Sequence, residues 1–229
     1  MEMNITDLPE KLSTGCNGFD AFLGGGLEPK IITQFVGEGG CGKSTLCLCA
    51  AVSALSQGIG VIYIDTEGFS IDRFCQIAGD NADTYAKSLF ISEPATFEEQ
   101  GAAIIDAEKL LKTGKAGLII VDSATALYRM ESSEKDAVSI LSKQMMTLLG
   151  MAKRYEIPTL ITNQVFMDIE HQKLCGLGGT SLMHISKVIV NVEKHCGYRK
   201  AVILKHRSEE EGKSWNFVLT NTGIEEKAI

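Results

Sequence analysis

Eight residues, Gly37 to Ser44, read GEGGCGKS and stand between the apolar run 31–36 and a helix-compatible stretch, 45–56. Glycine costs folding entropy, so several glycines directly after a buried strand indicate that the backbone itself must approach a ligand closely. The stretch satisfies the pattern G-x-x-x-x-G-K-[ST], in which main-chain N–H groups converge on phosphate oxygens. The following helix directs its positive end at the same anion. The pattern therefore predicts a phosphate-binding loop.

A magnesium-bound phosphate site needs further polar groups beside the loop. Lys43 supplies a mobile positive charge, and Ser44 supplies a hydroxyl for Mg²⁺. Asp122 ends the apolar run 117–122, and ligands gather at the carboxyl ends of such strands in open α/β sheets. We therefore expect ATP as the nucleotide, with Ser44 and Asp122 holding Mg²⁺ via water. The expected nucleotide contacts are Gly37, Glu38, Gly39, Gly40, Cys41, Gly42, Lys43, Ser44, Thr45 and Asp122.

Hydrolysis of a nucleotide also needs a group that positions water. Asp65 and Glu67 follow the apolar run 60–64, and spacing alone leaves both open because side chains two apart on a strand share a face. Asn163 and Gln164 end another strand, where a neutral amide can bind the γ-phosphate and move when that group leaves. The alternative for this pair is a strand-end amide that bonds only to the protein.

The elements that must position these residues alternate along the chain. The expected strands are 31–36, 60–65, 88–92, 117–122 and 158–165, followed by 187–193, 200–206 and 214–220. Helices are expected between the first five, one capped by Thr96 and another over 134–155. Alternating strands and helices predict an α/β fold with a mainly parallel, twisted sheet flanked by helices. The short links after residue 186 predict that the sheet ends in antiparallel strands, all within a single domain, 1–229.

Composition narrows the class of protein. The chain has 229 residues, a formal net charge of −7 and seven cysteines without a C-x-x-C pair. These features favour reduced thiols in a cytoplasmic protein and disfavour a disulfide framework or a zinc site. No apolar run approaches the length of a membrane span, so no membrane partner is expected. Because the chain is acidic, any contact with nucleic acid must come from local patches or from several subunits together.

Six motifs in order resemble the RecA-type recombinase core in its archaeal and eukaryotic branch. They are STGCNGFDAFLGGGLE, GEGGCGKST, YIDTEGF, LIIVDSATALYR, ITNQV and GLGGTSLMH, and the resemblance runs from about residue 12 to residue 223. The chain looks most like the short archaeal paralogues of the RadA recombinase. The resemblance implies a RecA-like ATPase core, with Glu67 as the water-activating acid and Gln164 as the γ-phosphate sensor.

The same resemblance implies two DNA-facing segments, near 129–136 and 166–180. The DNA-facing candidates are Arg129, Lys135, His171, Lys173 and His184. Acidic residues outnumber Lys and Arg in both segments. Each Lys or Arg that neutralises a phosphate adds to DNA affinity through counterion release, so we expect weak to moderate, salt-sensitive binding to DNA.

A basic stretch near the C-terminus, 193–207, has two interpretations. One is a solvated hairpin. The other concerns Lys205 and Arg207, because KHR resembles the Lys-x-Arg element with which KaiC-like and Sms-type ATPases reach the γ-phosphate of an adjacent subunit. On that interpretation, the protein works as a homo-oligomer and its nucleotide and oligomeric states are linked.

Two departures from the family pattern bear on function. The sequence begins at the core, without an N-terminal helix-hairpin-helix domain, and contains no F-x-x-A docking motif. The resemblance therefore favours an accessory protein of homologous recombination that binds ATP and DNA, hydrolyses ATP weakly and does not catalyse strand exchange. It suggests a RadA-type recombinase and a Holliday-junction resolvase as partners. The alternatives are an active filament-forming recombinase and a KaiC-like regulatory ATPase that does not act on DNA.

Overall fold

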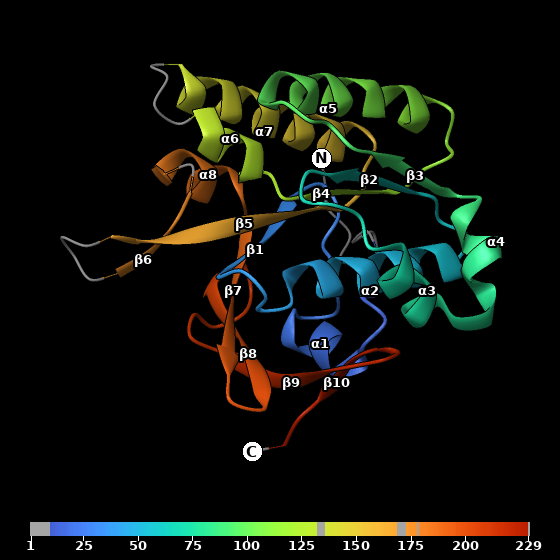
Figure 1. Ribbon diagram of the computed structural model, residues 1–229, viewed down its shortest axis with the longest axis vertical. Helices are drawn as coiled ribbons and strands as arrows, with labels where there is room; N and C mark the ends of the chain where they lie inside the picture. Colours follow the sequence, from blue (N-terminus) through green and yellow to red (C-terminus); the bar gives the residue numbers. More distant parts are fainter. Residues whose placement is uncertain (1–9, 132–135, 169–172, 178, 229) are drawn as a thin grey trace, which may run out of the picture.

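One mixed sheet organises the protein, seen in the computed structural model, which describes residues 10–131, 136–168, 173–177 and 179–228 (Figure 1). The strands are β1 (Ile32–Gly37), β2 (Val61–Asp65), β3 (Leu89–Ser92), β4 (Leu118–Asp122), β5 (Thr159–Asp168), β6 (Lys173–Gly176), β7 (Val188–His195), β8 (Tyr198–Lys205), β9 (Ser214–Thr220) and β10 (Gly223–Glu226). They run in the order β10-β9-β8-β7-β1-β5-β4-β2-β3, and β6 pairs with β5. The predicted fold class is confirmed.

The parallel part of the sheet brings the candidate residues to one edge. β1, β5, β4, β2 and β3 are parallel neighbours, and β1 and β4 are buried along their whole length. In this register Gly37 lies beside Gln164, and Asp65 lies beside Asp122. Strands that are apolar on both faces form such covered sheets, which is why the five early strands could be predicted.

Helices cover both faces of the parallel part. The helices are α1 (Asn17–Phe22), α2 (Lys43–Ser56), α3 (Ile71–Ala78), α4 (Ala82–Ala86), α5 (Phe97–Lys112), α6 (Ala126–Glu131), α7 (Ala137–Arg154) and α8 (Gly179–Ile185), with a short 3₁₀ turn, η2 (Gly79–Asn81). α5, α6 and α7 lie on one face, and α1, α2 and α3 lie on the other (Figure 1). Each face has its own hydrophobic core. No helix in the described ranges combines the length and the apolar character that a membrane crossing requires.

Helix starts follow from local sequence. Thr96 caps α5 as predicted, since its Oγ1 accepts a hydrogen bond from the Glu99 N–H at 3.1 Å. α7 begins at Ala137, three residues later than the predicted start at 134, and residues 132–135 lie outside the described part of the chain. A helix was expected between the strands 60–65 and 88–92, but without bounds; α3 lies there, and Ser70 caps it by accepting a hydrogen bond from the Arg73 N–H.

The antiparallel extension begins at β7. This strand pairs in parallel with β1 and antiparallel with β8, and the predicted turn joins His195 to Tyr198. β8 then pairs with β9, and β9 pairs with β10. Of these strands, only β10 was not predicted from the sequence. β10 is only four residues long and ends in two exposed glutamates, so it carries little hydrophobic signal.

The second expected DNA-facing segment has regular structure at both ends. β5 continues to Asp168, beyond the predicted end at 165, and pairs antiparallel with β6. α8 follows directly and includes the end of the segment. We refer to this β5–β6 pair as the β5–β6 ribbon.

The segments that lead into β2 and β4 approach each other closely at Gly60. The Gly117 N–H donates to the Gly60 carbonyl at 2.9 Å, and a Cβ added at Gly60 would lie 1.9 Å from the Lys115 carbonyl oxygen. Glycine is therefore required where the chain enters β2 beside β4.

Candidate nucleotide-binding site

The loop from Gly37 to Ser44 connects β1 to α2 and leaves its main chain open. Gly40 and Gly42 have φ of +70° and +110°, a region that side chains strongly disfavour. A Cβ added at Gly39 or Gly40 would meet no atom within 4 Å. The loop therefore forms a cradle of backbone groups at the N-terminus of a 14-residue helix, which suits an anion.

Lys43 lies across this cradle. Its Nζ donates to the carbonyl oxygens of Gly37 at 2.9 Å and Glu38 at 2.8 Å, and only 7% of the residue is exposed. Cys41 is fully buried, and its Sγ lies 3.6 Å from the same Nζ, so Cys41 can offer a ligand its main chain only. The lysine charge is thus held at the loop by two neutral acceptors, which phosphate oxygens could replace.

A cavity of about 340 Å³ opens beside the loop. Its lining residues are Gly39, Gly40, Gly42, Lys43, Ser44, Thr45, Glu67, Gln164 and Leu219. The structure thus brings together most of the predicted loop residues with both Glu67 and Gln164. An open backbone cradle, a lysine and a cavity of this volume fit a nucleotide phosphate chain.

A second cavity of about 240 Å³ adjoins the first, sharing Ser44, Thr45 and Glu67. Asp122 lies in its wall and is almost fully buried. Its Oδ1 accepts a hydrogen bond from Thr162 Oγ1 at 2.6 Å, and its Oδ2 accepts one from the Tyr63 hydroxyl at 2.9 Å. Burial and the neighbouring Asp122 raise the pKa of Tyr63 well above its usual value, which keeps the phenol a donor.

Ser44 and Asp122 fit a hydrated magnesium ion. Both offer oxygen and both line the second cavity. Among the residues that the structure describes, no cluster of three His, Cys, Asp or Glu side chains could form a complete cage for a metal ion. Mg²⁺ needs no such cage, since it retains several waters and is held by one or two protein oxygens together with phosphates.

The structure separates the two candidate acids that spacing left open. Asp65 is buried, and its Oδ2 accepts a hydrogen bond from the Gly68 N–H at 2.6 Å. Burial raises the pKa of Asp65 to about 6, and Asp122 and Glu93 add to the rise. Glu67 reaches the first cavity, where desolvation and the nearby Asp122 raise its pKa. The geometry therefore favours Glu67 as the group that faces a nucleotide.

Asn163 and Gln164 also differ in their surroundings. Gln164 Nε2 donates to Glu67 Oε1 inside the first cavity. Asn163 is buried, where its Oδ1 accepts from Thr125 Oγ1 at 2.8 Å and its Nδ2 donates to the Leu177 carbonyl at 2.9 Å. Of this pair, only Gln164 is placed to contact a ligand. Asn163 bonds to other groups of the protein, which was the alternative interpretation for these two amides.

Lys205 and Arg207 have partners within their own chain. Lys205 Nζ donates to the carbonyls of Met183 at 2.7 Å and Ser186 at 2.8 Å, at the end of α8. Arg207 forms an ion pair with Glu28 at 2.5 Å. Neither Lys205 nor Arg207 lines either of the two cavities. Their action on a neighbouring subunit therefore stays a prediction.

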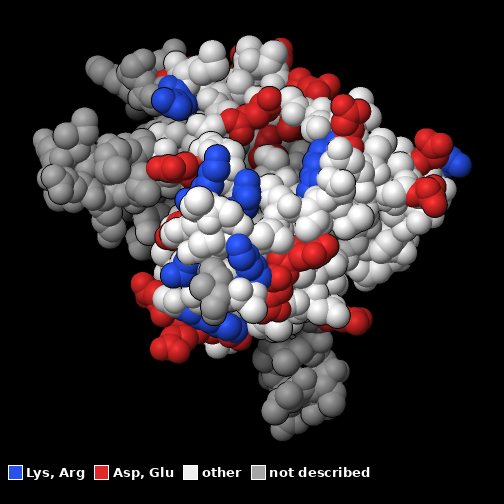
Figure 2. All heavy atoms as spheres, turned by 60° about the horizontal axis from the view of Figure 1, so that its bottom comes forward, with Lys and Arg blue, Asp and Glu red and all other residues white. Residues whose placement is uncertain are grey.

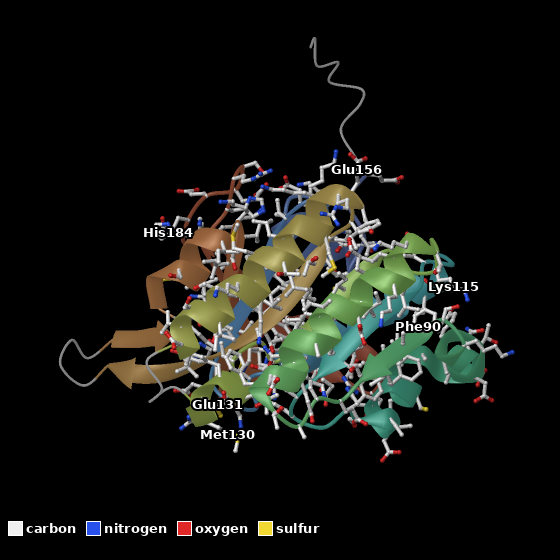
Figure 3. The ribbon with its side chains drawn as sticks, turned by 90° about the horizontal axis from the view of Figure 1, so that it is seen from above. Phe90, Lys115, Met130, Glu131, Glu156 and His184 are labelled. Atoms are coloured by element: carbon white, nitrogen blue, oxygen red, sulfur yellow. The ribbon has the colours of Figure 1, made fainter. Side chains whose placement is uncertain are left out.

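The DNA-facing candidates that the structure describes line neither cavity. Arg129 is on α6, and His184 is exposed on α8 (Figure 3). Lys173 is in β6, while Lys135 and His171 lie outside the described residues. α6 and the β5–β6 ribbon lie on the same side of the molecule in Figures 1 and 3. The two segments therefore share one side, and His184 is not brought to the nucleotide cavity.

Arg73 is a site residue that the sequence analysis missed. It lines the second cavity, and its guanidinium donates to the carbonyls of Asn221 at 3.2 Å and Gly223 at 3.0 Å. It lies on α3, so the Ser70 cap was the one sequence signal that could have placed it at the start of a helix.

Comparison with known proteins agrees with this architecture. The Rad51 family model matches residues 9–227. The DNA repair and recombination protein RadB of Methanoculleus marisnigri is 54% identical, over 94% of this chain and 97% of that protein. RadB of Methanococcoides burtonii is 45% identical, over 95% of this chain and 98% of that protein. A crystal structure of the RadB recombinase superposes with a TM-score of 0.81 at 36% identity, covering 95% of this chain and 100% of the other. The expected resemblance is confirmed, and the chain belongs to the Rad51 family and, within it, to the archaeal RadB proteins.

Proposed function

We propose that this protein is an ATP- and DNA-binding accessory factor of homologous recombination and DNA repair, built as a single RecA-like ATPase domain. The observation that carries the proposal is the open backbone cradle beside Lys43, which shares one cavity with Glu67 and Gln164. Its relatives are named as DNA repair and recombination proteins, which supports the cellular role.

Each residue of the site has a role in this proposal. The loop amides and Lys43 bind the phosphates of ATP, while Ser44 and Asp122 hold Mg²⁺ via water. Mg²⁺, when bound, offsets the negative charge of the phosphates. Glu67 orients water at the terminal phosphate, and Gln164 responds to that phosphate through the strand that leads to the β5–β6 ribbon.

The resting geometry supports slow hydrolysis. Glu67 Oε1 accepts a hydrogen bond from the Gln164 amide, and this bond favours the charged form and makes the carboxylate less basic. A less basic carboxylate takes a proton from water less readily, which supports weak turnover. By family resemblance we propose a RadA-type recombinase and a Holliday-junction resolvase as the partners.

The nucleotide part is tested by calorimetry with Mg-ATP. Lys43→Ala should weaken ATP binding by about 10- to 150-fold, because one hydrogen bond between a charged donor and a phosphate is lost. Lys109→Ala, on an exposed face of α5, removes the same charge away from the site and should bind as the wild type does. Absence of heat with the wild type would overturn the proposal.

The DNA part is tested by fluorescence anisotropy of single- and double-stranded DNA across salt concentrations, with and without ATP. We expect moderate binding that falls steeply with salt, because binding depends on release of counterions from phosphates. Strand exchange by the protein alone would instead identify an active recombinase. No binding even at low salt would identify a regulatory ATPase that does not act on DNA.

A further inference from the structure

Arg199 lies on β8 and points toward the core side of the sheet. It is cross-strand partner to Phe217, which is fully buried, and it alternates with Ala201 and Ile203, which are also fully buried. Residues two apart on a strand share a face, so Arg199 continues a buried apolar row. An arginine in such a row needs a reason, because a charged group is rarely placed toward the core without a partner.

The end of this row meets the phosphate-binding loop. A Cβ added at Gly42 would lie 3.4 Å from Arg199 Cδ and 3.5 Å from Arg199 Nε. Leu219 packs at the same spot, 3.4 Å from that Cβ position, and lines the first cavity. Arg199 therefore borders the loop at Gly42 from the side of the antiparallel strands, next to Leu219, which lines the cavity that also holds Glu67 and Gln164.

One donor of the Arg199 guanidinium has no partner in the described part of the chain. That donor is Nε, which is buried. A buried donor without a partner is unfavourable, and such groups in native proteins are commonly satisfied by a ligand or ion. In Figure 2, which brings the antiparallel strands forward, Lys and Arg side chains gather near a hollow whose rim carries Asp and Glu.

We propose that Arg199 is a second phosphate-binding cation of the nucleotide site, supplied by the same chain. This inference rests on the proposed nucleotide binding and adds to it a residue on β8 that borders the loop at Gly42. Arginine suits the role because its planar donors match phosphate oxygens and keep their charge at any physiological pH. The antiparallel extension would then sense an occupied loop directly, through β8.

The test removes the positive charge of Arg199 and keeps the packing of its aliphatic stem. Arg199→Met retains the aliphatic stem beside Gly42 and Leu219 but removes the guanidinium. Lys200→Met is the matched control, since Lys200 is next on the same strand, faces the other way, pairs with Glu193 and carries the same charge. Arg199→Lys restores the charge without the planar donors. Thermal unfolding without nucleotide checks that each variant is folded.

The binding constants of Mg-ATP and of inorganic tripolyphosphate are measured for each variant. We expect Arg199→Met to weaken both by about tenfold or more, Arg199→Lys to recover part of the loss, and Lys200→Met to match the wild type. Wild-type affinity in Arg199→Met would overturn the role of Arg199 and leave the proposed function standing. A loss for ATP alone would also overturn it, because it would indicate a contact with the nucleoside. Failure of the wild type to bind either ligand would overturn both proposals.

Discussion

Three carboxylates, Asp65, Glu67 and Asp122, share the small volume beside the loop. Two of them are buried, and the pKa values of Asp65 and Glu67 are raised by desolvation first and by Asp122 second. Crowded acids of this kind oppose folding, and they are retained where a cation completes the site. The residues themselves thus indicate that the isolated chain carries unfavourable negative charge, which Lys43 offsets in part and which a bound cation would offset further.

Asp65 gives a pH prediction. Its pKa is about 6 in the folded chain, above the value near 4 of an unfolded aspartate, so folding takes up a proton between these pH values. Stability from this group is therefore full below about pH 4 and falls as the pH rises through 6. Asp65→Asn keeps the acceptor for the Gly68 N–H and removes the titration. Relative to wild type, it should be more stable by about 1–3 kcal/mol at pH 7.5 and equal near pH 4.

Urea unfolding at pH 4, 5.5 and 7.5, without nucleotide or magnesium, measures this difference. Asp83→Asn, at an exposed position on α4, serves as the control and should follow the wild type at all three pH values. A constant difference between Asp65→Asn and wild type across the pH range would contradict the prediction.

Residue types and their order predicted most of the site. The loop, Asp122, Glu67 and Gln164 were found because their chemistry is carried by motifs, and the structure places them around two adjoining cavities. Spacing alone could not choose between Asp65 and Glu67, and Glu67 was preferred only through the family resemblance, since the choice depends on which side chain reaches the first cavity. Arg199 was treated as part of a solvated hairpin, because its place in the buried row depends on pairing with β9.

At the scale of elements, apolar content decided what could be predicted. The five strands that are covered by helices were found, and their ends were correct within a few residues. The helix expected between 65 and 88 had no predicted bounds, because α3 is only eight residues long and exposes Ile71. β6 and β10 were missed because their sequences, KLCG and GIEE, lack the apolar run that marked the equally short β3, LFIS.

Asn163 links β5, where the β5–β6 ribbon begins, to Thr125 just before α6 and to Leu177 just after β6. Asn163→Ala removes the bonds to Thr125 and to the Leu177 carbonyl, and leaves the buried Thr125 hydroxyl and the part-buried Leu177 carbonyl without that partner. The free energy of unfolding should fall by about 1–3 kcal/mol. Amide hydrogen exchange in 165–177 should rise more than in β1, because the ribbon loses its anchor.

The control for this variant is Asn191→Ala, where the amide is half-exposed on β7 and donates to Glu193 on the same strand. Its effect should be within about 0.5 kcal/mol. Equal exchange in the ribbon of both variants would show that Asn163 does not anchor it.

For the whole molecule, the question is whether one subunit completes the site of another. Arg207→Ala should lower ATP turnover of the assembled protein and leave ATP binding by the monomer intact, if Arg207 reaches the nucleotide of a neighbour. Within one chain, however, Arg207 is paired with Glu28. Turnover and binding are therefore measured side by side for Arg207→Ala and Glu28→Gln.

The two variants separate an intersubunit role from a structural one. Glu28→Gln breaks the same ion pair but leaves Arg207 available to a neighbouring subunit. Turnover should then be retained or raised in Glu28→Gln and reduced in Arg207→Ala. Equal losses in both would show that the ion pair acts only within the chain.

The close approach at Gly60 has a consequence for the reacting groups. A single methyl group there would meet the Lys115 carbonyl and wedge the beginning of β2 away from β4. These two strands deliver Asp65 and Asp122 to the far end of the sheet, on the order of 15 Å away. A genetic screen for inactive variants would therefore recover Gly60 substitutions, although this glycine touches neither cavity and carries no chemistry of its own.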